Sequence, residues 1–367
     1  MCQGKIRPLF FFKTSMKKLL ILWLACAFMA SAAAQEKQEE GKKSQAKTLT
    51  NVVNTLKDRI TLEGYIQLGY TYNDQPASKT NTFDIKRAIL MARGRITDHW
   101  SCYFMYSLAN SPKILEIYTE YHFLPEISVR VGQFKTMYTI ENPMSPSVLE
   151  LINVNSQATN YLAGYNGSDP LYGSTTGRDM GLMIYGDLFK GLLNYKLAVM
   201  NGQGINLKDG NNQKDIVGNL MVNPLEWLSV GGSFIKGKGC AVATSDITPD
   251  IQVGDSYTRN RWAAGLKIKL KQLDLRSEYL AGKDGTVKSD GYYATANVHL
   301  ISNKLDFIAS YDYFNKNKAA DNKQTNYIAG LQWWFYPKCR LQVQYTYCNP
   351  HLGENYNLLQ TQVQVRF

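Results

Sequence analysis

Apolar and polar residues alternate with a period of two along most of the chain beyond about residue 59. The last such segment, residues 358–367, runs Leu-Leu-Gln-Thr-Gln-Val-Gln-Val-Arg-Phe. Successive side chains of a β-strand point to opposite faces, and a strand of a transmembrane barrel needs an apolar face toward lipid and a polar face toward water. The alternation therefore predicts an all-β fold, a transmembrane antiparallel β-barrel over residues 59–367, with the last segment as its closing strand.

Sixteen segments carry this pattern, an even number that is typical of single-chain bacterial barrels. They are residues 59–72, 82–97, 100–109, 114–123, 126–136, 177–188, 191–202, 215–223, 226–237, 257–270, 272–282, 289–301, 304–314, 324–336, 339–349 and 358–367. The connections after even-numbered strands are tight turns, such as Asp98-His99 and Pro337-Lys338. Several after odd-numbered strands are longer, namely 137–176, 203–214, 238–256 and 315–323. Short turns at one end and longer loops at the other favour an outer-membrane barrel with both chain ends in the periplasm.

The N-terminal part has a different pattern. Met16-Lys17-Lys18 precedes the apolar run 19–25, and the small residues 32–34 offer a cleavage site. This order is typical of a signal peptide, so residues 1–34 are predicted to be one, with either Met1 or Met16 as the true start. Residues 35–58 are predicted to form a polar periplasmic tail with a short helix, because their apolar residues recur at helical spacing. Beyond the leader, no apolar run reaches about 18 residues, which excludes helical membrane spans.

Composition adds three constraints. Tyrosine is abundant, with 24 residues, which suits aromatic girdles at the two membrane interfaces. The net charge of +11 owes much to the leader, and the other basic residues are spread along the chain; without a basic stripe, nucleic acid is not expected as a partner. The four histidines lie in no recognisable catalytic motif, so the chain is not expected to be an enzyme.

The cysteines beyond the leader are Cys102, Cys240, Cys339 and Cys348. Their spacing fits no zinc motif, and no metal or other cofactor is expected. Export permits disulfides, yet the predicted topology places Cys102 and Cys339 at one rim of the barrel and the other two at the opposite rim. Any pairing therefore stays open, and isolated thiols are the preferred interpretation.

The alternation also assigns basic residues to the inner face. An Arg or Lys on the lipid face at the bilayer midplane would cost about 2–4 kcal/mol, and a barrel of sixteen strands leaves an aqueous channel for such residues to line. The basic residues predicted to line this channel are Arg87, Arg93, Arg95, Arg130, Lys135, Arg178, Arg261, Lys267, Lys269, Arg276 and Arg340. Lys135 is the exception, because strict alternation puts it on the face opposite Arg130.

The longest connection, residues 137–176, follows the fifth predicted strand. A loop of this length can fold into the barrel and set a constriction; a surface loop is the alternative. It contains no Lys or Arg, whereas the acids Glu141, Glu150 and Asp169 are present. Since screening removes attraction beyond about 8–10 Å at physiological salt, anions would have to be drawn by cations of the wall.

Several segments resemble the phosphate-selective porin O and P family: residues 83–88 (Phe-Asp-Ile-Lys-Arg-Ala), 131–136 (Val-Gly-Gln-Phe-Lys-Thr), 177–181 (Gly-Arg-Asp-Met-Gly) with 186–188, and 201–204. This resemblance implies a sixteen-stranded trimeric porin with an inward-folded third extracellular loop. It also implies basic residues that draw anions to the constriction. The acidic loop departs from that pattern and favours a broader pore over a phosphate-specific one.

These observations predict an outer-membrane porin for passive diffusion of ions and small hydrophilic solutes, with at most a weak preference for anions such as phosphate. The alternative is a non-conducting scaffold, adhesin or receptor that presents its surface loops. The expected partners are outer-membrane lipid and lipopolysaccharide, small anions or hydrophilic solutes, two further copies in a homotrimer, and the barrel-assembly machinery through Phe367.

Overall fold

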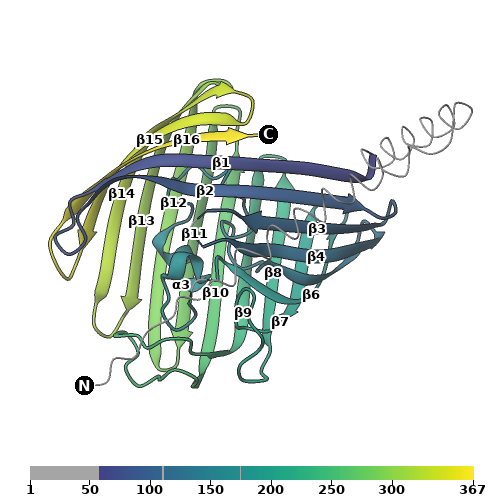
Figure 1. Cartoon of the computed structure of the whole chain (residues 1–367), viewed down its shortest axis with the longest axis horizontal. Helices are drawn as coiled ribbons and strands as arrows, with labels where there is room; N and C mark the ends of the chain where they lie inside the picture. Colours follow the sequence, from purple (N-terminus) through teal and green to yellow (C-terminus); the bar gives the residue numbers. More distant parts are fainter. Residues whose placement is uncertain (1–57, 110, 174) are drawn as a thin grey trace, which may run out of the picture. The chain divides into compact units, whose positions relative to one another are not determined.

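The computed structural model describes residues 58–109, 111–173 and 175–367. Sixteen strands close into one antiparallel barrel, in which each strand pairs with its neighbours in sequence and β1 pairs with β16 (Figure 1). The prediction of a sixteen-stranded antiparallel barrel is therefore confirmed. The predicted signal peptide, and the tail and helix up to residue 57, lie outside the described residues. No helix of the described part is long and apolar enough to cross a membrane.

The strands are β1 (Ile60–Asn73), β2 (Thr80–Arg95), β3 (Trp100–Ser107), β4 (Lys113–Leu124), β5 (Ile127–Lys135), β6 (Arg178–Leu188), β7 (Leu193–Met200), β8 (Asp215–Leu225), β9 (Leu228–Cys240), β10 (Ser256–Lys269), β11 (Leu273–Asp284), β12 (Val287–Ile301), β13 (Leu305–Asn317), β14 (Asn322–Tyr336), β15 (Cys339–Pro350) and β16 (Tyr356–Arg366). Between β5 and β6 lie the helix α3 (Gln157–Leu162) and the short 3-10 helix η1 (Tyr165–Gly167).

The register follows the alternation that the sequence shows. In β15, Val343 and Tyr345 are exposed on the outside, whereas Gln342 and Gln344 are buried inside. Because the ring is closed, every strand has two neighbours, and its backbone groups can be satisfied without water, as a bilayer requires. The outer face can therefore present apolar side chains to the lipid.

Two connections are shortened proportionally more than the others relative to the predicted strand ends. Strands β13 and β14 extend beyond the predicted ends, so the expected loop 315–323 shrinks to residues 318–321. The turn between β11 and β12 has only two residues, although it lies on the side of the longer loops. Gly285 takes a φ of 58° there, a left-handed conformation that glycine adopts without strain and that suits a two-residue hairpin.

The positions of the cysteines agree with the predicted topology. Cys102 and Cys339 lie near the starts of β3 and β15, whereas Cys240 and Cys348 lie near the opposite ends of β9 and β15. All four are free. This arrangement fits the interpretation as isolated thiols.

Candidate functional site

Residues 136–177, called the inner loop below, connect β5 to β6 and lie against the inner face of the barrel. Near the start of the loop, the amide of Thr139 donates to Ser233 Oγ at 2.8 Å, and the amide of Ile140 donates to Glu278 Oε1 at 2.8 Å. Ser233 belongs to β9 and Glu278 to β11. The loop therefore leaves the wall at β5 and reaches strands elsewhere on the ring.

Glutamines of β15 hold the middle of the inner loop. The side-chain amides of Gln342 and Gln344 both donate to the carbonyl of Glu150, at 2.7 and 2.6 Å. Gln344 Oε1 also accepts from the amide of Ile152 at 2.8 Å. Buried backbone groups need partners, and these inward-facing glutamines supply them. The inner face of β15 is thus a docking surface for the loop.

The return path of the inner loop contains α3, which packs against β11, β12 and β13 (Figure 1). Ser156 caps this helix, because its Oγ accepts from the amide of Thr159. The amide of Gln157 donates to the Asp312 carboxylate at 3.0 Å, so a wall carboxylate satisfies a free amide at the helix start.

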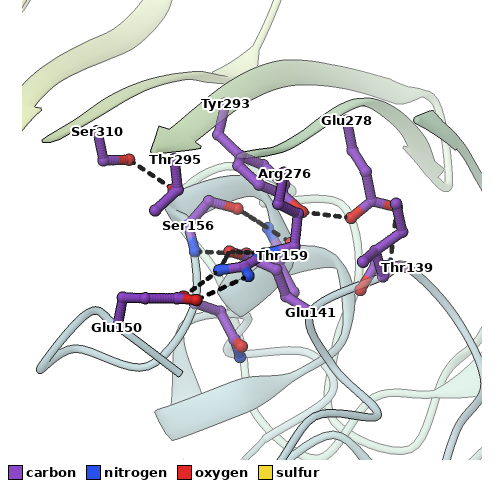
Figure 2. Close-up of polar contacts among 12 residues, drawn as sticks. Thr139, Glu141, Glu150, Ser156, Thr159, Arg276, Glu278, Tyr293, Thr295 and Ser310 are labelled. Atoms are coloured by element: carbon purple, nitrogen blue, oxygen red, sulfur yellow. Dashed lines mark hydrogen bonds and ion pairs between the residues drawn. The ribbon is translucent and has the colours of Figure 1, made fainter. Parts of the chain in front are cut away.

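Arg276 of β11 joins two distant points of the inner loop (Figure 2). Its Nη2 lies 3.3 Å from Glu141 Oε1 and 2.8 Å from Glu150 Oε2. Glu141 also accepts from the amide of Ser156 at 2.8 Å, which ties the first part of the loop to the cap of α3. All three charged side chains are buried. Removing Arg276 would leave two buried carboxylates without their cation.

The two acids of this cluster differ in their environments. Burial raises the pKa of Glu141, and the opposing effect of Arg276 does not fully offset it. Burial also acts to raise the pKa of Glu150, but the ion pair with Arg276 outweighs it and the pKa is lowered overall. Glu150 is therefore the acid that holds Arg276 most firmly.

Arg261 of β10 is a second attachment point. Its Nη2 lies 2.7 Å from Asp169 of the inner loop and 2.9 Å from Asp284 of β11, and its Nη1 donates to the carbonyl of Leu162 at the end of α3. Burial, together with the nearby Asp284, raises the pKa of Asp169. The arginine thus neutralises acids that would otherwise be unpaired.

Arg259 is an attachment residue that the sequence reasoning missed. It lies two residues before Arg261 on the same face of β10. Its Nη2 donates to Asp215 at 2.5 Å and to the Gly202 carbonyl at 2.7 Å. Its guanidinium carbon lies 3.9 Å from the ring centre of Tyr172 in the inner loop. The alternation that assigned Arg261 could have found Arg259 as well.

The face of Lys135 also needs a correction. Gln133, Phe134 and Lys135 are all buried, so the alternation of faces stops at the end of β5. Gly132, just before them, takes a φ of 136°, which departs from an ordinary strand. The Lys135 ammonium donates to the carbonyls of Asn142 and Met144 at 2.7 and 2.5 Å. Lys135 is therefore a support of the inner loop.

Several residues expected to line the channel are thus covered. Arg178, Arg261, Arg276 and Arg340 are between 1% and 6% exposed. Arg178 pairs with Glu116 at 2.8 Å, and the other three bind the inner loop, Arg340 through the Leu149 carbonyl at 2.9 Å. The physical reason is that a buried loop brings carboxylates and carbonyls that need donors.

The loop acids are corrected in the same way. The sequence places Glu141, Glu150 and Asp169 as the acids of the predicted constriction loop. All three are buried and paired with arginines of the wall. They therefore contribute little free negative charge to any open space.

The inner face of β2 to β5 is different, because its cations remain accessible. The Arg93 side chain is 53% exposed and the Arg130 side chain 17%, while Glu120 beneath them is only 4% exposed. Arg130 Nη2 lies 2.6 Å from Glu120 Oε2, and its guanidinium carbon lies 4.1 Å from the centre of the Tyr118 ring. Tyr185 also donates to Glu120 at 2.9 Å. The acid is shielded and the arginines face open space.

A cavity of about 230 Å³ separates this face from the inner loop. The wall contributes Arg93, Tyr103, Arg130 and the largely buried ion pair of Arg178 with Glu116. The loop contributes Pro143 and Pro146, among other residues. The cavity therefore lies where a polar, positively charged wall faces an uncharged part of the loop. This arrangement can select solutes by size and by charge.

The remaining predicted residues lie elsewhere on the inner face. Arg87 donates to Gln67 Oε1 at 2.8 Å. Arg95 is exposed near the end of β2, and Lys267 and Lys269 are exposed toward the end of β10. None of these four cations lines the cavity beside Pro143.

Comparison with known proteins agrees with this geometry. The family model of the phosphate-selective porin O and P family matches residues 45–226. Over this stretch the chain belongs to the phosphate-selective porin O and P family. The match places the chain among outer-membrane porins, with its barrel in the outer membrane. No curated protein matches the sequence.

Solved structures resemble this porin in fold. An anion-selective porin from Comamonas acidovorans has 14% identity and a TM-score of 0.63, covering 84% of this chain and 99% of its own. The outer-membrane channel DcaP of Acinetobacter baumannii has 11% identity and a TM-score of 0.60, with 84% and 97% covered. OmpF of Salmonella typhi, in complex with daunomycin, has 14% identity and a TM-score of 0.60, with the same coverage.

Proposed function

We propose that this porin is a passive diffusion channel whose narrowest part lies between the inner loop and the inner face of β2 to β5. Ions and small hydrophilic solutes pass the cavity beside Arg93 and Arg130. The observation that carries the proposal is a difference in solvent exposure between acids and cations. The loop acids are buried in ion pairs, whereas Arg93 and Arg130 keep exposed surface.

This inequality gives the pathway a weak preference for anions. Exposed cations at a constriction raise the local concentration of anions without binding them tightly. Arg130 is partly neutralised by Glu120, and Arg93 is solvated, so neither offers a desolvated phosphate site. A phosphate ion is therefore attracted like other small anions and is not held.

The test is conductance of the purified porin in planar bilayers, with the zero-current potential measured across a potassium chloride gradient. We expect open channels, a potential with the sign of weak chloride preference, and no saturable block by millimolar phosphate. Strong phosphate block would show a tight anion site. Folded, inserted protein that carries no current would reject the channel and favour a scaffold or receptor role.

We also propose that the porin assembles as a homotrimer, because the family that it resembles does so. Cross-linking in the membrane followed by gel analysis of unheated samples tests this assembly. A monomer under all conditions would reject it and would leave the proposed pathway within one barrel unchanged.

A further inference from the structure

A row of lysines runs across the outer face of the barrel, on neighbouring strands and at one height. Lys236 of β9 lies opposite Asn260 of β10, and Asn260 lies opposite Lys283 of β11. Lys283 lies opposite Lys288 of β12. The amide of Lys318, just after β13, donates to the Lys288 carbonyl at 2.9 Å. We call Lys236, Lys283, Lys288 and Lys318 the lysine row.

The lysine row lies outside the lumen. Along β9, Lys236 follows the buried, inward-facing Ile235, and along β11, Lys283 precedes the buried Asp284. All members of the row are exposed. They lie at the strand ends that carry the longer loops, the extracellular side of a porin.

Aromatic side chains lie directly beneath the row. Trp262 is the next outward residue after Asn260, and its ring centre lies 5.5 Å from that of Tyr279. A hollow of about 500 Å³ on the outer face is lined by the lysine row together with Trp262, Phe234 and Tyr279. Cations at the upper edge and aromatic rings below suit a molecule with a charged head and an apolar body.

The lysine row carries more positive charge than the protein neutralises. Like charges directly opposite each other on one face of a sheet are destabilising, and Lys283 faces Lys288 in this way. Among the described residues that line the hollow, the one acid is Asp290, which pairs with Lys318 and accepts from the Tyr279 hydroxyl. An anion from outside the chain would relieve the remaining repulsion.

We propose that the lysine row binds the phosphorylated headgroup of a lipid in the outer leaflet of the outer membrane. The phosphates contact Lys236, Lys283 and Lys288, and the acyl chains cover Trp262 and Phe234. The outward position favours a lipid over a free ion, because inorganic phosphate has no apolar part that could contact the aromatic rings of the hollow. The proposed site requires that the longer loops lie on the extracellular side, and it does not require that the barrel conducts.

The experiment measures binding of diphosphoryl lipid A to the full-length porin in detergent by native mass spectrometry. The variant K236Q/K283Q/K288Q removes the unpaired part of the row, and K79Q/K208Q/K214Q removes exposed loop lysines on the same side. We expect the first variant to bind roughly tenfold less lipid or weaker still, since each lysine near an anionic headgroup contributes separately. The control should stay within about twofold of the parent.

Other outcomes reject the proposal. Equal loss in both variants would indicate diffuse charge attraction, and no loss in either would mean that the row is unused. Lipid A without phosphates that binds as well as the diphosphoryl form, or displacement by millimolar inorganic phosphate, would also overturn it. Single-channel conductance should be unchanged in the row variant, which shows that the barrel is folded and separates this test from that of the channel.

Discussion

The inner face of β9 to β16 and the inner face of β2 to β5 both carry arginines, yet the two walls use them differently. On the first wall, Arg261, Arg276 and Arg340 are buried beneath the inner loop and satisfy its acids and carbonyls. On the second wall, Arg93 and Arg130 rest on Glu120 and remain accessible. An arginine on the inner face is therefore accessible to a solute only where the inner loop does not cover it.

The comparison divides the luminal cations into supports and selectors. Supports have loop carboxylates or carbonyls as partners and little exposed surface, so their loss should change the position of the inner loop. Selectors have partners on their own wall and exposed surface, so their loss should change the field in the cavity. Variants on the two walls should separate these effects.

The largest effect is expected for Arg276→Ala. It leaves Glu141 and Glu150 buried without their cation, and breaking such a group costs about 3–5 kcal/mol. The inner loop should loosen, with larger and noisier single-channel currents and a lower temperature for the loss of the folded band on unheated gels. Arg93→Ala is the matched control, and unchanged currents in Arg276→Ala would reject the role as a support.

The next effect concerns pH. The pKa of Glu150 is lowered, so its ion pair stabilises the loop at neutral pH and is lost as the pH falls through that lowered value. The pKa of Glu141 is raised by burial, so its protonation removes the free-energy cost of keeping a buried carboxylate charged. As the pH falls from neutrality, loop-derived current noise should therefore set in only when Glu150 takes up its proton, below the usual range of a glutamate carboxyl.

Two substitutions sharpen this expectation. Glu150→Gln should move the onset of noise to higher pH and destabilise the porin by about 3 kcal/mol, because it weakens the main partner of Arg276. Glu141→Gln should change stability by less than about 1 kcal/mol, because an amide oxygen can still accept from Ser156. The reverse order of the two variants would contradict the assignment of Glu150 as the firmer partner.

The strands and their faces could be predicted from the sequence because each depends on neighbours in the chain. Alternation alone indicates that Val343 faces outward and Gln344 inward. It also indicates that Arg93 and Arg276 share the inner face. The pairing of the strands could be predicted as well, since consecutive strands pair in chain order and the first pairs with the last.

The division into supports and selectors could not be predicted, because it depends on contacts between distant parts of the chain. Arg276 meets Glu141 only after the inner loop has crossed the lumen. The end of β5 shows a second limit, because Lys135 is buried where alternation stops after Gly132. The lysine row shows a third limit of prediction from the sequence. The free-energy penalty for a Lys on the lipid face falls to about 0–1 kcal/mol near the interfaces, so it does not decide the face of a Lys there.

Selectivity should respond to the exposed wall. Arg93→Ala removes the most accessible cation at the cavity, so the zero-current potential across a potassium chloride gradient should shift toward cations. Stability should change by less than about 1 kcal/mol, because the ion pair with Glu120 is long and solvated. An unchanged potential would mean that solutes do not pass beside β2.

The smallest shifts are expected for Arg87→Ala and Lys267→Ala, whose side chains face the lumen but do not line the cavity. At 0.1 M salt the screening length is about 10 Å, so cations away from the narrowest part act weakly on a solute within it. Their effect on the zero-current potential should grow as the salt is diluted, whereas the effect of Arg93→Ala should depend less on salt. Equal salt dependence in all three variants would place the selective charge along the whole lumen and would remove the distinction between the two walls.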